Sequence, residues 1–143
     1  MNTENTFPDA VNKHSNFLIN LGFIVYEKLE CDTSAFGNSY YRFKSEKVGI
    51  EIVLDKGQVL LKIGKISEDR RDWLEWSHVM KAYAPDVKAY DFDIDIEPQV
   101  KRISELAQQY CTKLLSGDFN DENLLRVIED AYGKNFLRRF LQS

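Results

Sequence analysis

The chain has 143 residues, 43% hydrophobic and 29% charged, which predicts a single globular domain over residues 1–143 that needs neither metal nor disulfide. Nineteen Lys+Arg against 23 Asp+Glu give 19 − 23 = −4, which argues against a general nucleic-acid binder. The polar residues 1–5 lack the features of a signal peptide and are expected to be flexible. No apolar run approaches the roughly 20 residues of a membrane span. We therefore expect a cytoplasmic protein with no nucleic-acid and no membrane partner.

The first 65 residues predict a helix followed by four strands. Pro8 suits the first turn of a helix, and apolar residues then recur at helical spacing up to a stop at Gly22. From Phe23 the hydrophobic period is two, and four segments follow this pattern: 23–29, 39–44, 48–54 and 59–63. Asp55-Lys56-Gly57 is a hairpin signal, because glycine adopts the positive φ that such a turn needs. These patterns predict a four-stranded antiparallel meander with one buried face.

Helical spacing returns after Ile66. Three to four helices are predicted there: one capped by Ser67 and ended by Pro85, one from Pro98 to Gly117, one capped by Asn120, and a last one after Gly133. The order of elements predicts an α+β fold: an N-terminal helix, the four-stranded antiparallel sheet, and three to four C-terminal helices packed on one sheet face.

Patterns that carry catalysis or bind metal are missing from the sequence. There is no Gly-x-Ser-x-Gly elbow, no phosphate loop and no Cys-x-x-Cys pair. Cys31 and Cys111 are 80 residues apart and are expected to be reduced thiols. The spaced aspartates of 91–95 do not make a calcium loop, because Ile96 and Arg102 stand where glycine and a carboxylate are needed. We expect no enzyme activity, no metal and no cofactor.

Charge is concentrated in residues 86–97, where five acids and one lysine give −5 + 1 = −4, the formal charge of the whole chain. Acidic and apolar residues alternate there. In a strand, same-face side chains would stand roughly 6.5–7 Å apart, and the acids would form a docking strip for a basic partner. This strip comprises Asp91, Asp93, Asp95 and Glu97. The alternative is an edge strand or free loop whose charges keep it in solution, and the sequence leaves both open.

A family resemblance covers about residues 17–65. It is carried by Leu21-Gly22-Phe23, by Ala35-Phe36-Gly37-Asn38, by Tyr40-Tyr41-Arg42-Phe43, and by the stretch from Val48 to Val59. This part of the chain resembles small bacterial immunity proteins that are encoded beside polymorphic or contact-dependent toxins. The resemblance implies a cytoplasmic protein that binds and blocks one partner protein, and it offers no catalytic residues to carry over.

The leading hypothesis is a non-enzymatic protein-binding module, an immunity-type inhibitor of a toxin domain or other basic partner. Trp73 and Trp76 are added to the acidic strip as candidate interface anchors, with burial in the core as their alternative. A second hypothesis is a ligand-binding protein or enzyme with a pocket between sheet and helices, lined by Tyr40, Arg42, Trp73, Trp76 and His78. A third is a structural subunit that pairs through a sheet edge or through Phe136 and Phe140. Monomer and homodimer both stay open.

Overall fold

The computed structural model describes residues 3–30 and 38–142, with side chains from residue 7 onward. The predictions for Cys31 and for the Ala35-Phe36-Gly37 part of the resemblance lie outside these residues. The described elements are α1 (Thr3–His14), α2 (Asn16–Asn20), β1 (Ile24–Leu29), β2 (Ser39–Lys44), β3 (Val48–Asp55), β4 (Gln58–Lys65), a 3-10 turn η1 (Arg70–Asp72), β5 (Leu74–Glu75), α3 (Trp76–Tyr83), α4 (Ile96–Tyr110), α5 (Thr112–Leu115), α6 (Glu122–Tyr132) and α7 (Lys134–Gln142).

The strands form one antiparallel sheet in the order β1-β2-β3-β4-β5. The predicted meander is confirmed, but the sheet has five strands and not four, because Leu74 and Glu75 pair with the end of β4. The hairpin between β3 and β4 is also confirmed. Lys56 and Gly57 have φ of 50° and 82°, and two positive φ values in a two-residue loop match the twist of the strands.

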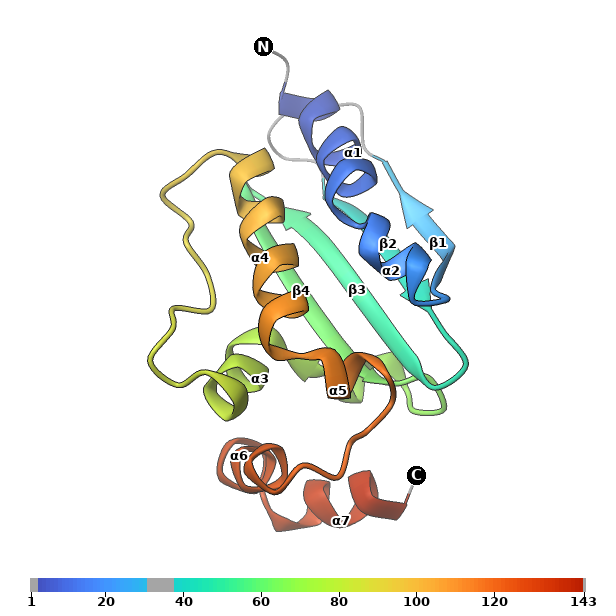
Figure 1. Cartoon of the computed structure of the whole chain (residues 1–143), viewed down its shortest axis with the longest axis vertical. Helices are drawn as coiled ribbons and strands as arrows, with labels where there is room; N and C mark the ends of the chain where they lie inside the picture. Colours follow the sequence, from blue (N-terminus) through green and yellow to red (C-terminus); the bar gives the residue numbers. More distant parts are fainter. Residues whose placement is uncertain (1–2, 31–37, 143) are drawn as a thin grey trace.

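One face of the sheet is covered by α1, α2 and α4, and the α+β class is confirmed (Figure 1). Alternate residues of β2, β3 and β4 point into this layer, which buries Tyr41, Phe43, Ile50, Ile52, Leu61 and Ile63. Not every C-terminal helix lies on that face. In Figure 1, α3, α6 and α7 gather at one end of the sheet, where α6 packs on α3 and α7 packs on α6.

Several predicted boundaries differ from the structure. Helix α1 includes residues 3–5, which were expected to be flexible, and Ser15 separates it from α2. Helix α4 begins two residues before Pro98. The N-cap of α6 is Asp121 and not Asn120, because the Asp121 carboxylate accepts backbone hydrogen bonds at 2.9 and 3.2 Å from the next turn. The glycine stop after α6 is confirmed, with a φ of 96°.

The largest correction concerns residues 67–75, which form a turn, η1 and β5 in place of the predicted helix capped by Ser67. Trp73 explains this path. Its indole lies on the uncovered face of the sheet over the paired glycines Gly49 and Gly64, and its Nε1 donates to the Lys65 carbonyl at 3.1 Å. Helix α3 then starts at Trp76 and is capped by the Glu75 carboxylate. Trp73 therefore lies between η1 and β5, whereas Trp76 is the first residue of α3.

Candidate functional site

The acidic segment is a loop and not a strand. Residues 84–95 contain no regular element and connect α3 to α4 as the long yellow loop of Figure 1. The first two residues of α4 are Ile96 and Glu97, so the predicted strip ends inside a helix. The four carboxylates consequently do not form a row along one strand face.

Side-chain hydrogen bonds hold this loop against the edge of β4. The Tyr90 hydroxyl accepts from the Leu61 amide at 3.1 Å and donates to Glu75 Oε1 at 2.6 Å. Burial and the bond to Glu75 raise the pKa of Tyr90, so the hydroxyl stays a donor. The buried Gln99 amide accepts from the Val59 amide at 2.9 Å. Tyr90 and Gln99 thus replace a neighbouring strand along this edge.

Three further side chains donate hydrogen bonds to backbone carbonyls of this loop. The Trp76 indole Nε1 donates to the Ala89 carbonyl at 3.1 Å, and Gln99 Nε2 donates to the Ile94 carbonyl at 2.8 Å. The Arg102 guanidinium donates to the Lys88 carbonyl. These hydrogen bonds reach the loop at its middle and near its end, so neighbouring elements position its backbone although it lacks regular structure.

Exposed carboxylates and an exposed aromatic ring are neighbours in sequence on this loop. Phe92 is 39% exposed and stacks on Tyr90 with ring centroids 4.9 Å apart. Asp93 and Asp95 are exposed, and Asp91 is half-buried and accepts from the Asp93 amide at 3.1 Å. We call Asp91, Phe92, Asp93 and Asp95 the acidic loop surface.

Glu97 does not belong to this surface. Its Oε1 lies 2.9 Å from His14 Nε2 and 3.5 Å from Lys13 Nζ, at the end of α1. The hydrogen bond from His14 and the charge of Lys13 hold the pKa of Glu97 below its ordinary value. The Glu97 carboxylate thus joins α4 to α1.

The two tryptophans are buried, Trp73 to 4% and Trp76 to 1% exposure. Their rings take the core role that was the alternative to interface anchors. Trp76 still contributes indirectly to the acidic loop surface, because its indole holds the loop backbone at Ala89.

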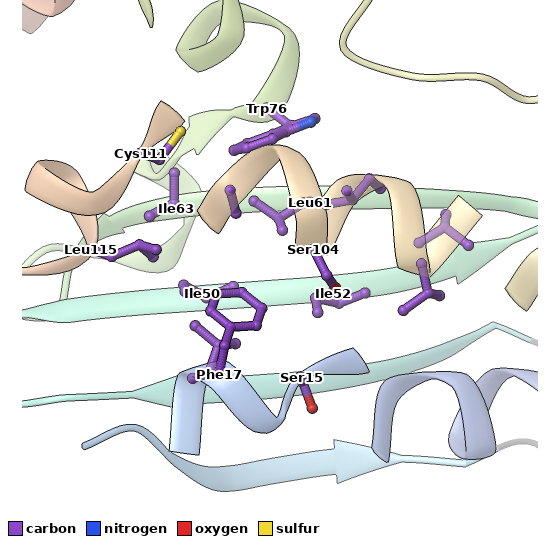
Figure 2. A pocket seen from close by; sticks show the side chains of 15 residues that line it. Ser15, Phe17, Ile50, Ile52, Leu61, Ile63, Trp76, Ser104, Cys111 and Leu115 are labelled. Atoms are coloured by element: carbon purple, nitrogen blue, oxygen red, sulfur yellow. The ribbon is translucent and has the colours of Figure 1, made fainter. Parts of the chain in front are cut away.

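The residues predicted for a ligand pocket do not converge. Arg42 lies on the uncovered sheet face, bonded to Glu51 at 2.7 Å, and its guanidinium stands 3.9 Å from the centre of the Tyr40 ring. His78 Nδ1 lies 2.7 Å from the Tyr132 hydroxyl and joins α3 to α6. Of the five, Trp76 alone lines the cavity between the sheet and its helices, shown in Figure 2. That cavity measures about 20 Å³, is almost wholly apolar and has the size of one water.

A larger hollow lies elsewhere, beside the end of β4. It measures about 420 Å³ and is lined by Glu46, Lys47, Lys65, Ile66, Ser67, Gly117, Phe119, Asn120 and Leu141. Lys65 is engaged there, because its ammonium donates to the Phe140 carbonyl and stands 4.3 Å from the centre of the Phe140 ring. Burial lowers the pKa of Lys65. None of the five residues predicted for a ligand pocket lines this hollow.

Phe136 and Phe140, which were candidates for a dimer contact, pack within the chain instead. Phe140 is 1% exposed, and Phe136 stacks between Tyr132 at 4.7 Å and Phe140 at 6.5 Å. These rings pack α7 against the rest of the domain.

Cys111 is a free thiol at the end of α4 and lines the small cavity with its side chain fully buried. Burial raises the pKa of this thiol to about 12, so almost none of it is the reactive thiolate at neutral pH.

We expect Cys111 in the folded chain to resist alkylation by iodoacetamide at mildly alkaline pH, and to react at least tenfold faster in concentrated urea. Peptide mass spectrometry distinguishes Cys111 from Cys31 in the same sample. Equal rates of alkylation at Cys111 with and without urea would contradict the burial.

Sequence reasoning missed the exposure of β1. The strand carries Ile24, Val25, Tyr26 and Leu29 at 57%, 42%, 38% and 49% exposure, whereas we expected one of its faces to be buried. A signal was present, because Ile24-Val25-Tyr26 places apolar residues at consecutive positions and hence on both faces of a strand.

Among the described residues, no group of three His, Cys, Asp or Glu side chains is placed to hold a metal ion, and no helix is long and apolar enough to span a membrane. Comparisons of the chain with models of known protein families, with curated proteins and with solved structures find no match.

Proposed function

We propose that this chain is a non-enzymatic protein-binding module that presents the acidic loop surface to a basic partner protein. The observation that carries the proposal is an exposed aromatic ring, flanked in sequence by carboxylates, on a loop whose backbone is held by hydrogen bonds of Tyr90, Trp76 and Gln99. Interfaces combine an aromatic anchor with a polar rim, and a surface ordered before binding loses less entropy on association.

The charge of the loop favours a basic partner. Asp86, Asp91, Asp93 and Asp95 leave a net charge of −4 + 1 = −3 after Lys88 is counted, and Glu97 is already paired with α1. Carboxylates of this kind accelerate encounter with a positively charged surface and select against acidic ones. Within this class we propose an immunity-type inhibitor, in line with the resemblance over residues 17–65. Blocking a toxin needs only complementary shape and charge.

The test compares three immobilised baits in extract from the native cell. These are the wild type, the loop variant Asp91→Asn/Asp93→Asn/Asp95→Asn, and a control with the same net charge, Glu46→Gln/Glu129→Gln/Asp130→Asn, at exposed positions elsewhere. We expect one stoichiometric protein to be retained by wild type and control at low salt. Its retention should fall at least tenfold with the loop variant and weaken as salt rises. Equal retention by all three baits, or no retained protein at low salt, would overturn the proposed surface.

The inhibitor assignment has a separate readout. The retained partner is expressed alone, with the wild-type chain, or with the loop variant. We expect the partner alone to stop growth and the wild-type chain to restore it. A partner that does not impair growth would refute the immunity-type assignment and leave the binding module standing.

Phe92→Ala is expected to weaken partner binding about tenfold through faster dissociation, because the ring supplies the apolar centre of the surface. Surface plasmon resonance with the purified partner measures both rates. A change confined to the association rate would contradict the anchor role, since Phe92 carries no charge.

A further inference from the structure

The two edges of the sheet differ in whether their backbone groups are bonded to other parts of the chain. Along β4, Gln99 accepts from the Val59 amide and donates to the Gly57 carbonyl, and Tyr90 accepts from the Leu61 amide. Strand β5 then pairs with Lys62 and Ile63. Side chains and a two-residue strand thus cover this edge, as proteins commonly do to prevent unwanted strand pairing.

Strand β1 forms the opposite edge and pairs only with β2 among the described strands. Its four large apolar side chains are exposed, and they are preceded by Ile19 and Leu21, which are 49% and 55% exposed. An edge strand that is paired on one side only and carries apolar side chains on both faces is typical of a strand-pairing interface.

A bulge at Tyr26 gives β1 a symmetric order of faces. Ile24 lies opposite Lys44 and Leu29 lies opposite Tyr40, so both point to the uncovered face of the sheet. Val25 and Lys28 lie opposite Phe43 and Tyr41 and point to the helix side. Glu27 lies opposite Arg42 on the uncovered face. Tyr26 also lies there, with the Lys44 ammonium 5.2 Å from the centre of its ring.

Read in either direction, the six residues follow the same order of faces: uncovered, helix side, uncovered, uncovered, helix side, uncovered. Without the bulge, Ile24 and Leu29 would lie on opposite faces, because they are five positions apart. An antiparallel pairing of two copies places directly opposite residues on the same face. The bulge therefore makes β1 complementary to itself.

We propose that β1 pairs antiparallel with β1 of a second copy of this chain, with Ile24 of one copy opposite Leu29 of the other. Val25 then lies opposite Lys28, whose stem is apolar, and Tyr26 lies opposite Glu27. The contacts at both ends of the pairing are aliphatic, and backbone hydrogen bonds form between them.

The order of faces favours this register over both of its neighbours, and charge also disfavours the neighbour in one direction. In one direction, a shift by one position puts Glu27 opposite Glu27 of the other copy, and a shift by three puts Lys28 opposite Lys28. The shift by two puts Glu27 opposite Lys28, but these two side chains lie on different faces of the sheet. In the proposed register Glu27 keeps its bond to Arg42, and Lys28 keeps its ion pair with Glu30 at 3.4 Å. The dimer joins two five-stranded sheets and leaves the acidic loop surfaces at opposite far edges, because that loop lies beside β4 (Figure 1).

The mass of the chain in solution tests this pairing. The mass measured by light scattering is expected to approach twice the chain mass of 16.7 kDa as the concentration rises. On dilution it should return to 16.7 kDa. Ile24→Lys/Leu29→Lys changes residues that are exposed in the single chain, so it should fold normally. It brings the introduced lysines face to face and should keep the mass at 16.7 kDa at all concentrations. Leu141→Lys, at an equally exposed leucine on α7, is the matched control and should dimerise like wild type.

Ile24→Lys/Leu29→Glu tests the register itself. In the proposed pairing each introduced lysine faces an introduced glutamate of the other copy, so dimerisation should return and should weaken with salt. A wild type that keeps the single-chain mass at its highest soluble concentration overturns the proposal. So does a dimer that survives the double-lysine change, or a lysine–glutamate variant that stays monomeric. These results are independent of partner binding, since no residue of the acidic loop surface is changed.

Discussion

Gly49→Ala is expected to lower the free energy of unfolding by about 3 kcal/mol, at the upper end of what overpacking usually costs. A Cβ built on Gly49 would stand 2.2 Å from Trp73 Cζ2, and one on Gly64 would stand 2.5 Å from Trp73 Cδ1. The indole is held in place by its hydrogen bond to the Lys65 carbonyl, and the glycines are held by the pairing of β3 with β4. A methyl group can therefore be accommodated only by displacing the ring.

The measurement is urea unfolding of four chains: wild type, Gly49→Ala, Trp73→Ala and the double variant. Trp73→Ala removes a buried ring and should itself cost about 3–5 kcal/mol. Because the clash disappears with the ring, the double variant should be more stable than the sum of the single changes allows, by at least 1 kcal/mol. Additive costs would show that Gly49 is needed for some reason other than the indole.

The central hairpins could be predicted because their signals are local. In β2, β3 and β4 a period of two and a turn with two positive φ values depend only on neighbouring residues. Residues 67–75 could not be predicted in the same way. The spacing of Trp73 and Trp76 fits a helix, but Trp73 instead fills a slot made by glycines 24 and 9 positions earlier in the chain. Tertiary packing overrode the local pattern.

In the candidate site too, some features could be predicted from the local sequence and others depend on distant residues. Sequence located the concentration of charge in residues 86–97, but its alternation suggested a strand. The structure makes a loop there, since Tyr90 and Gln99 satisfy the β4 edge with side chains and leave no place for a paired backbone. The removal of Glu97 from the acidic surface depends on Lys13 and His14, more than 80 residues earlier. Such partners cannot be read from the segment itself.

Gln99→Leu is expected to lower the free energy of unfolding by about 3 kcal/mol, although leucine has a similar volume. Gln99 is 3% exposed, and its side-chain amide makes three hydrogen bonds, with the Val59 amide and with the carbonyls of Gly57 and Ile94. Leucine would leave these backbone groups without their partner at a site that water reaches poorly, and each such group costs about 1–3 kcal/mol. Gln108→Leu is the matched control, because Gln108 is exposed and makes one bond to Ser104; it should change stability by less than about 0.5 kcal/mol.

Amide hydrogen exchange identifies the cause of the Gln99→Leu loss. If Gln99 closes the β4 edge, exchange at Val59 should accelerate more than at Ile52 in the interior of the sheet, and Tyr90→Phe should do the same at Leu61. The freed edge should also add self-association that persists in the Ile24→Lys/Leu29→Lys background, because it does not use β1. If Val59 keeps its protection in Gln99→Leu, the edge is closed by something other than this amide.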